Sequence, residues 1–421
     1  MARSLVPALK HLLVPCCVLL SAACTAGHHG PDAEGRSFAL EGDADAGEPG
    51  ADAGPAAAGV YLVGKYVETE ELQNTFFSTV TAASAAELAG FDAEQSGLSV
   101  GTGTLVVPHG NAVFAPAAVA PELTRFVLTE SGALAQGPTL SFASAGVSSV
   151  TGWQLAFVSE TKAYLFDSDS SRVLVWNPST MELSATVIDL SSARREGLTV
   201  GLGVREARQV GERLFVPAYW YDADFVDVRT SAVLVLDTST DQLTAVASDD
   251  RCPGYVLVAL PNGDLHMLPD GYFAQVFHLD QEAPRTPLCS LRIRAGEEVF
   301  DPDYSQDLGA LVGGDELSGG SVQGGISDGR GGIYLSVADE ELYAAGEANV
   351  YRMWHWEPAS GSARELPDAP YWPDFMVANE RGGQRFGLVQ SLEQTLVIDL
   401  SAEPFTTFSL PGLIDPFVRV R

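Results

Sequence analysis

Carboxylates at alternating positions are the most recognisable pattern for metal chemistry in this sequence. Asp301, Asp303 and Asp307 lie within seven residues, and such an alternation of oxygen ligands is typical of calcium-binding loops. The segment departs from an EF-hand loop, because Gln306 stands at the sixth position, where a glycine is needed, and no Glu lies at the twelfth. We interpret it as a solvated acidic loop, with weak calcium binding as the open alternative, and expect no other cofactor.

A second group of residues has side chains suited to binding a planar ligand. Tyr219, Trp220 and Tyr221 are consecutive in the chain and could stack on a ring system such as a catecholate. Arg194 and Arg195, together with the arginines at 205 and 208, are the best candidates for a basic patch that attracts an anion. The alternative is structural, since aromatic side chains also pack sheets together.

Residues for nucleophilic or acid-base catalysis do not form a recognisable constellation. His109, in Pro108-His109-Gly110-Asn111, is predicted at a strand end near the mouth of a channel, with a hydrogen-bonded structural histidine as the alternative. No GxSxG motif is present, and the glycine-rich residues 309–332 lack the Lys-Ser/Thr of a phosphate-binding loop. We therefore predict no catalytic residue.

The five cysteines have separate predicted roles. Cys16 and Cys17 leave with a signal peptide, and Cys24 is the candidate for lipidation. Cys252 and Cys289 remain, and an isolated pair outside the cytoplasm most often forms a structural disulfide. The absence of a CxxC spacing argues against a redox-active or metal-binding pair.

The first 23 residues are typical of a lipoprotein signal peptide. Arg3 and Lys10 precede an apolar run that ends in Ser21-Ala22-Ala23-Cys24, an imperfect lipobox. The run is too short for a membrane span, which needs roughly twenty apolar residues. We predict cleavage before Cys24 and a lipid anchor, with an ordinary secreted protein as the alternative. Thr25 in place of an aspartate favours the outer over the inner membrane, facing the periplasm or the cell surface.

Net charge excludes one class of partner. The chain carries a formal charge of −31, and removal of residues 1–23 leaves 22 basic and 55 acidic residues, or −33. Nucleic-acid binding requires a concentrated basic surface, and anionic lipid headgroups would repel the chain, so membrane attachment should come from the lipid. Residues 24–58 are rich in Gly, Ala, Asp, Glu and Pro and predict a disordered tether.

Residues 59–421 predict an all-β domain built from a repeated hairpin. Each copy has an apolar strand, then an Asp or Asn, then a Ser/Thr-rich turn and a second strand. The copies are residues 123–134, 173–180, 233–240 and 395–401, with looser copies at 275–280 and 350–357 and a degenerate one near residue 79. The spacing indicates a β-propeller of four-stranded blades. We predict seven blades, with six or eight open, and expect the strand at residues 61–66 to complete the last blade.

Two long intervals between the copies predict insertions. They fall at residues 219–227 and 295–332. Because loops carry function more often than the scaffold beneath them does, we expect any binding surface on these two segments, presumed to share one face of the ring.

On these features the chain resembles exported bacterial propeller lipoproteins, among them those encoded beside myxochelin-type siderophore genes in myxobacteria. The resemblance covers most of residues 60–421. Its carriers are the lipobox, residues 61–63, residues 101–111 and residues 128–132. It implies an accessory of iron-siderophore uptake, with a ferric siderophore or an outer-membrane uptake receptor as partner, and it transfers no catalytic residue.

Two functional hypotheses follow. The first is a lipid-anchored, non-catalytic binding or scaffold propeller, for which a protein partner fits better than a ferric siderophore because the acidic chain repels anions. The second is a metal-dependent hydrolase or lactonase at the channel mouth, which would need at least three inward-facing ligands around one ion.

Overall fold

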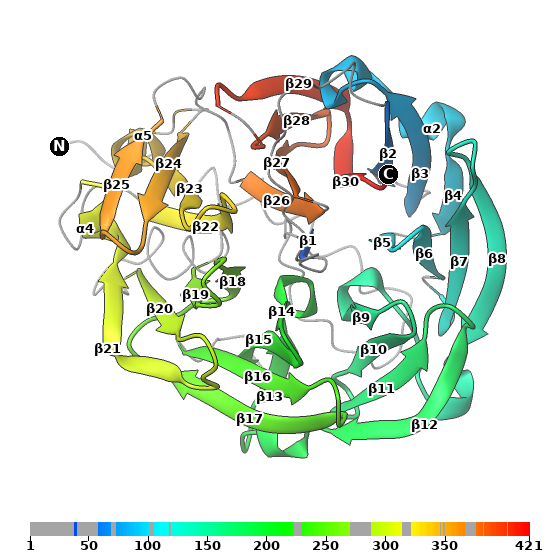
Figure 1. Cartoon of the computed structure of the whole chain (residues 1–421), viewed down its shortest axis with the longest axis horizontal. Helices are drawn as coiled ribbons and strands as arrows, with labels where there is room; N and C mark the ends of the chain where they lie inside the picture. The colour runs from blue at the N-terminus through cyan, green and yellow to red at the C-terminus, as the bar shows by residue number, and fades with distance from the viewer. Residues whose placement is uncertain are drawn as a thin grey trace, which may run out of the picture.

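Seven antiparallel sheets are arranged as blades around a central axis (Figure 1). The computed structural model describes residues 38–39, 58–68, 73–101, 105–117, 119–222, 230–269, 288–313, 321–345, 347, 350–366, 376–381, 383–401 and 403–421. The predicted all-β propeller with seven four-stranded blades is therefore confirmed. Among the described residues, no helix is long and apolar enough to cross a membrane.

The strands are given blade by blade, from the axis outwards. Blade 1 consists of β30 (Leu413–Arg419), β2 (Gly59–Glu68), β3 (Gln73–Ala82) and β4 (Leu98–Gly101). Blade 2 consists of β5 (Val107–His109), β6 (Ala112–Ala117), β7 (Glu122–Leu128) and β8 (Leu134–Ser141). Blade 3 consists of β9 (Leu155–Ser159), β10 (Lys162–Asp167), β11 (Arg172–Asn177) and β12 (Glu182–Asp189). Blade 4 consists of β13 (Thr199–Leu202) and β14 (Arg208–Val210), then β15 (Arg213–Tyr221), β16 (Ser231–Asp237) and β17 (Gln242–Asp249).

Three blades complete the ring. Blade 5 consists of β18 (Val256–Ala259), β19 (Leu265–Leu268), β20 (Cys289–Ile293) and β21 (Phe300–Asp307). Blade 6 consists of β22 (Ser321–Ser327), β23 (Ile333–Ala338), β24 (Tyr351–Glu357) and β25 (Ser362–Glu365). Blade 7 consists of β26 (Met376–Arg381), β27 (Gln384–Gln390), β28 (Gln394–Asp399) and β29 (Thr406–Pro411), with β1 (Phe38–Ala39) added at its inner edge. The helical turns are η2 (Ala85–Leu88), α2 (Ala93–Ser96), η3 (Ala143–Ala145), η4 (Gly152–Gln154), η5 (Ser191–Ala193), η6 (Val204–Glu206), α4 (Leu308–Leu311) and α5 (Glu340–Ala345).

The hydrophobic core is divided among the seven interfaces between neighbouring blades. In β16, Val233 and Val235 pack towards blade 5, whereas Ala232, Leu234 and Leu236 pack towards blade 3. Successive side chains of a strand point to opposite faces of its sheet, so a blade buried on both faces needs an unbroken apolar run. This requirement explains why the middle strands are continuously apolar instead of alternating with polar residues.

The two ends of the described chain close the ring together. β30, near the C-terminus, pairs with β2, so that Leu62 lies opposite Val418 and Lys65 lies opposite Ile414. The strand predicted at residues 61–66 does help to close the ring, but it does not complete the last blade: it lies in blade 1, and the C-terminal β30 completes that blade instead. Pairing of this kind leaves no exposed edge between the first and last blades.

The hairpin repeat predicted from the sequence is the outer half of a blade. Residues 123–134, 173–180, 233–240, 350–357 and 395–401 all fall in the third strand of a blade or in the turn that follows it. In blade 4, Asp237 accepts hydrogen bonds from the backbone amides of Ser239 and Thr240. The looser copy at residues 275–280 lies outside the described residues.

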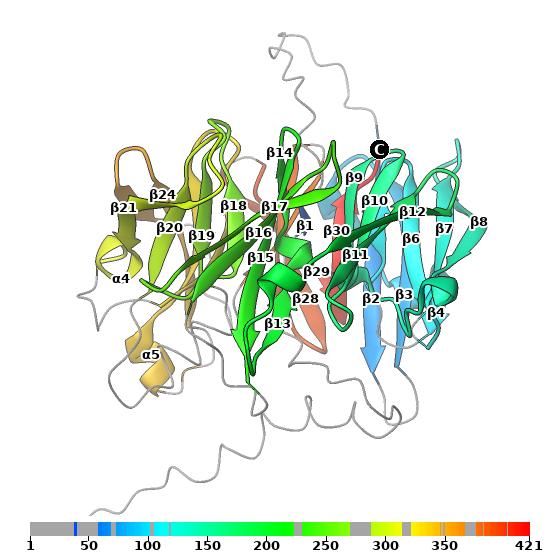
Figure 2. The same ribbon diagram turned by 90° about the horizontal axis from the view of Figure 1, so that it is seen from below.

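The propeller has two different faces. Each blade has four antiparallel strands, so the innermost strands all run in the same direction. The turns between first and second strands, such as residues 110–111 and 211–212, therefore gather on one side, which we call the turn face. The opposite side, the loop face, carries the connections between blades and those between second and third strands, including α5 (Figure 2).

Two sequence expectations are corrected by the strands. Residues 295–332 are not one long inserted loop, because β21, α4 and β22 occupy half of the segment. Residues 219–221 are the end of β15 and not part of a loop, although residues 223–229 lie outside the described part. Of the predicted tether, the structure describes Phe38 and Ala39, which form β1, and residue 58; the signal peptide and Cys24 lie outside it.

Candidate functional site

The innermost strand of blade 4 is interrupted at the centre of the ring. β13 pairs with the last four residues of β15, and β14 pairs with the first three. The five residues 203–207 between them stand opposite only Val216 and Pro217. The surplus residues fold into η6, which lies against β9, η4 and β1. A short helical turn therefore projects towards the ring axis, where the other blades present a strand (Figure 1).

Arg205 of η6 connects blade 4 to blade 1 across this centre. Its Nη2 donates to Oδ2 of Asp415, on β30, at 2.8 Å. The guanidinium carbon also lies 4.0 Å from the ring centroid of Trp153, within the range of a cation–π contact. Only 2% of the Arg205 side chain and 9% of the Asp415 side chain are exposed. The pair is a buried strut between η6 and β30, joining two residues 210 positions apart in the chain.

Burial controls the electrostatics of this strut. It raises the pKa of Asp415 above its usual value, and the positive charge of Arg205 opposes that shift. Beside this pair, Oε2 of the buried Glu206 lies 3.6 Å from Nη2 of Arg208. Burial lowers the pKa of Arg208. Opposite charges thus compensate one another at the centre of the ring. The arrangement is suited to holding blades together, because charges removed from water stabilise a fold only when paired.

His109 lies at the turn-face end of β5. It is 3% exposed, and its ring stacks on Phe157 with centroids 4.5 Å apart. Burial, reinforced by the nearby charge of Arg381, lowers the pKa of His109 to about 4, so the imidazole is neutral at pH 7. The guanidinium of Arg381 donates to the backbone oxygen of Gly110, beside this ring. His109 is therefore at a strand end, as predicted, but it is buried there and lies on the opposite side of the ring from the aromatic candidates.

The aromatic and basic candidates meet on the loop face of blades 3 and 4. The guanidinium carbon of Arg195 lies 3.4 Å from the ring centroid of Trp220, whose Nε1 donates to the oxygen of Ala193 at 2.9 Å. The exposed Arg194 donates through Nε to Ser171 Oγ at 2.6 Å. We call Arg194, Arg195 and the covered Trp220 the blade-4 cation surface. The arginines at 205 and 208 do not belong to it, because they lie buried at the ring centre.

Tyr219 and Tyr221 adjoin this surface on β15. Tyr219 is half-buried, and its ring lies 5.8 Å from that of Tyr221 and 5.1 Å from that of Tyr255. Its cross-strand partner is Gly201. A Cβ at position 201 would come within 2.2 Å of the Tyr219 ring, so the sequence needs glycine there for the aromatic group to pack flat on β13.

The acidic segment predicted as a solvated loop is a strand. Asp301 and Asp303 lie in β21, and Asp307 is its last residue and caps α4 through Ala310 N. The Asp301 carboxylate accepts hydrogen bonds from Arg292 at 2.5 Å and Arg294 at 2.8 Å, which help to lower its pKa to about 2. Two guanidinium groups thus occupy the carboxylate that the calcium interpretation required. Within the described ranges, no group of three or more His, Cys, Asp or Glu side chains could hold a metal ion.

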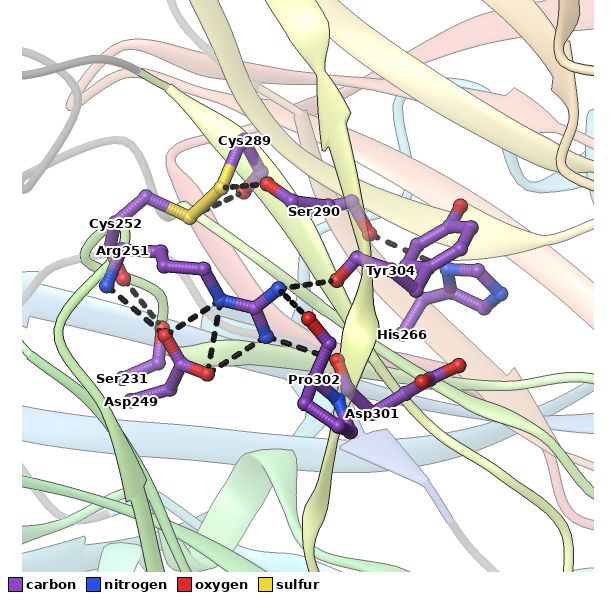
Figure 3. Close-up of a disulfide and its surroundings, with 11 residues drawn as sticks. Ser231, Asp249, Arg251, Cys252, His266, Cys289, Ser290, Asp301, Pro302 and Tyr304 are labelled. Atoms are coloured by element: carbon purple, nitrogen blue, oxygen red, sulfur yellow. Dashed lines mark hydrogen bonds and ion pairs between the residues drawn. A yellow bond between two sulfur atoms is a disulfide. The ribbon is translucent and has the colours of Figure 1, made fainter.

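The predicted disulfide is confirmed at the interface of blades 4 and 5. Cys252, in the connection after β17, is bonded to Cys289, the first residue of β20, with Cα atoms 5.9 Å apart. Beside it, Arg251 contacts both carboxylate oxygens of Asp249 and also donates to three backbone oxygens of β21, those of residues 301, 302 and 304 (Figure 3). We call Arg251 and the disulfide the rim clasp, because both tie the outer strand of blade 4 to blade 5.

Sequence reasoning missed the central strut. It named Arg205 only as a member of a surface patch and did not single out Asp415 or the break in the strand. One local signal was present, since the charged pair Arg205-Glu206 interrupts two short strand-forming segments. Its partner could not be found in the same way, because Asp415 is remote in sequence.

Comparisons with known proteins support the fold alone. No protein-family model matches the sequence, and no curated protein is significantly similar to it. A protein of known structure from Lactobacillus plantarum is 11% identical with a TM-score of 0.50, over 86% of this chain and 100% of that one. A candidate 6-phosphogluconolactonase from Bacteroides fragilis is 11% identical with a TM-score of 0.47, over 88% of this chain and 100% of that one.

Proposed function

We propose that this chain is a lipid-anchored, non-catalytic binding propeller of the bacterial outer membrane, whose partner is a protein of iron-siderophore uptake. The observation that carries the proposal is the buried ion pair at the ring centre. A propeller can present inward-facing side chains to a small molecule along its central channel. Here η6 and the Arg205–Asp415 strut stand at that position, so binding is assigned to an outer surface.

The blade-4 cation surface is the best candidate for that outer surface. It combines an exposed Arg194 with an Arg195 stacked on a buried indole, and Arg and Trp are enriched among residues that dominate protein interfaces. The side chains are held by neighbours, which reduces the entropy lost on binding. A chain with a net charge of −31 repels a free anionic ferric catecholate, so a protein partner with a complementary acidic or aromatic patch fits better.

Site-specific photo-crosslinking tests this proposal in intact cells. A photoreactive amino acid replaces Arg194, and the control replaces Val187, which is 52% exposed on β12 of the adjoining blade 3. We expect position 194 to crosslink to one outer-membrane protein and position 187 to give no such product. The product should disappear when Arg195→Ala is added. Equal crosslinking from both positions, or none from either, would contradict the blade-4 cation surface as the binding site.

A titration separates the remaining possibilities. The mature chain is mixed with a ferric catecholate siderophore while tryptophan fluorescence and bound iron are followed. Saturable quenching with one iron complex per chain would replace the protein partner by the siderophore itself. Stoichiometric calcium, zinc or iron in the purified protein would instead favour a metal-dependent hydrolase or lactonase.

A further inference from the structure

The inner edge of β26 is occupied by a piece of the chain that precedes the propeller. β1 pairs with β26 in parallel, with Phe38 opposite Asn379 and Ala39 opposite Glu380. β1 also lies against η6, and it is within the ring in both views (Figures 1 and 2). An innermost strand has free backbone N–H and C=O groups along its axial edge, and adding a strand to such an edge is a common mode of peptide recognition.

The sequence around β1 differs from the rest of the predicted tether. Between residues 25 and 58, Phe38 and Leu40 are the only large apolar residues and Arg36 is the only Lys or Arg. All three fall within five residues, whereas the remainder consists of small, acidic, histidine and proline residues. A uniform spacer has no need of such a cluster, but a docked strand does, because aromatic and aliphatic residues favour β-structure.

Asn379, which lies opposite Phe38 in the register, supplies an independent observation in favour of docking. Asn379 is completely buried, and neither its amide nitrogen nor its amide oxygen has a hydrogen-bond partner within the described part of the chain. A buried amide left without a partner costs about 1–3 kcal/mol. Docking of the tether beside Asn379 is one way to supply the missing donor or acceptor.

We propose that residues 36–40 are a docking strand that threads the N-terminal tether through the ring. β26 runs from the loop face to the turn face, and a parallel β1 runs in the same direction. The chain before residue 38 therefore leaves the ring on the loop face, and the chain after residue 39 leaves on the turn face, where β2 begins. Cys24 is only 14 residues before Phe38, so the lipid anchor lies on the loop-face side.

Threading adds one detail to the proposed function, namely which face of the ring is turned towards the membrane. This detail rests on the proposed function. If Cys24 is lipidated, the loop face with its blade-4 cation surface is turned towards the membrane. The partner is then an integral protein of the same membrane, reached by its exposed loops, and not a soluble protein of the opposite compartment. Threading itself does not depend on lipidation or on any partner.

Disulfide trapping tests the threading directly. The full mature chain carries Ala39→Cys with Glu380→Cys, two residues that lie opposite each other in the register. The matched control pairs Ala46→Cys with the same Glu380→Cys, so both variants lose the ion pair between Glu380 and Arg385. We expect the 39–380 disulfide to form about tenfold faster than the control, since a docked strand has a far higher effective concentration than a free tether. Equal rates would overturn the proposal.

Trypsin provides a second readout on the unmodified protein. Arg36 is the only tryptic site between Cys24 and Lys65. We expect cleavage after Arg36 to be about tenfold slower in the native chain than in a Phe38→Gly, Leu40→Gly variant, because exposed flexible segments are preferred cleavage sites. Identical cleavage rates would show that residues 36–40 do not dock. Either result is independent of crosslinking from position 194, so a failure of threading and a failure of the proposed function are distinguishable.

Discussion

Arg205 at the ring centre and Arg251 in the rim clasp both join two blades, but their surroundings differ. Arg251 is partly exposed, with a third of its side chain accessible, and it contacts Asp249 and three backbone oxygens of β21. Arg205 is 2% exposed, and its partner Asp415 is nearly as buried. Water can replace the lost partners of the first arginine but not those of the second.

The difference between these two arginines indicates which part of the fold depends most on a charged pair. At the rim, many geometrically good hydrogen bonds each contribute a modest amount, and solvent limits the cost of losing them. At the centre, one ion pair carries a large penalty if broken, because the surviving charge stays buried. The ring centre should therefore respond sharply to single substitutions and the rim weakly.

Among substitutions compared at pH 7, the largest expected effect is that of Arg205→Met. It leaves the Asp415 carboxylate buried without its cation, and breaking a buried pair on one side costs about 4 kcal/mol. We expect the free energy of unfolding to fall by that amount in a urea titration at pH 7. A loss below about 1 kcal/mol would mean that water reaches the strut and that the ring centre resembles the rim.

Removal of the disulfide is expected to cost slightly less. Cys252 and Cys289 are 37 residues apart, and a crosslink closing a loop of this length stabilises the fold by about 3.8 kcal/mol. We predict that the double variant Cys252→Ala, Cys289→Ala lowers the free energy of unfolding by this amount. The matched comparison is the intact protein titrated without reductant, and because both cysteines are buried, its disulfide should also react only slowly with a reductant when no urea is present.

Acid should weaken the fold through two buried histidines. Burial lowers the pKa of His109 and of His266 to about 4 in the folded chain. Since the unfolded pKa is about 6.5, the unfolded state binds protons first as the pH falls. The two histidines therefore leave the free energy of unfolding at its full value above pH 6.5. Between pH 6.5 and pH 4 this free energy falls by about 3 kcal/mol for each histidine.

Variants assign this pH dependence to its source. Replacing His109 and His266 with Phe should flatten the stability profile between pH 6.5 and pH 4, measured by urea midpoints at each pH. An unchanged slope would show that other groups are responsible. Asp301 is the internal contrast, because its pKa near 2 places its loss of stabilisation below pH 4.

The smallest expected effect is that of Arg251→Met. The substitution removes hydrogen bonds between charged and polar groups at a partly exposed site, each with a modest net value. We expect a loss of about 1.5 kcal/mol, well below that of Arg205→Met, in the same urea titration. A loss equal to or greater than that of Arg205→Met would reverse the comparison between rim and centre.

The sequence revealed the fold because its blades repeat a local signal. Asn177 accepts hydrogen bonds from the amides of Ser179 and Thr180, as Asp237 does in the next blade, and such turns can be read directly from residue types. Blade 5 hid this signal. Its third strand is β20, and the following residues 294–299 contain no Asx or Ser/Thr turn residue, so residues 275–280 match the repeat better than the true strand does.

The candidate site was less predictable for a physical reason. Apolar runs and turn residues act over a few positions, whereas the partner of Arg205 is 210 residues away. The alternating carboxylates of β21 could be read from the sequence, but the two arginines that occupy Asp301 come from β20 and the turn after it. Local spacing predicts which groups are available, and only the packing of blades decides which charges meet.

A double-mutant cycle at the ring centre tests the account most directly. The free energies of unfolding of the native chain, Arg205→Met, Asp415→Asn and the double variant are measured by urea titration at pH 7. A buried strut predicts that Asp415→Asn rescues much of the loss caused by Arg205→Met, with a coupling of about 2 kcal/mol or more. Additive effects within about 0.5 kcal/mol would contradict the buried strut on which the proposed function rests.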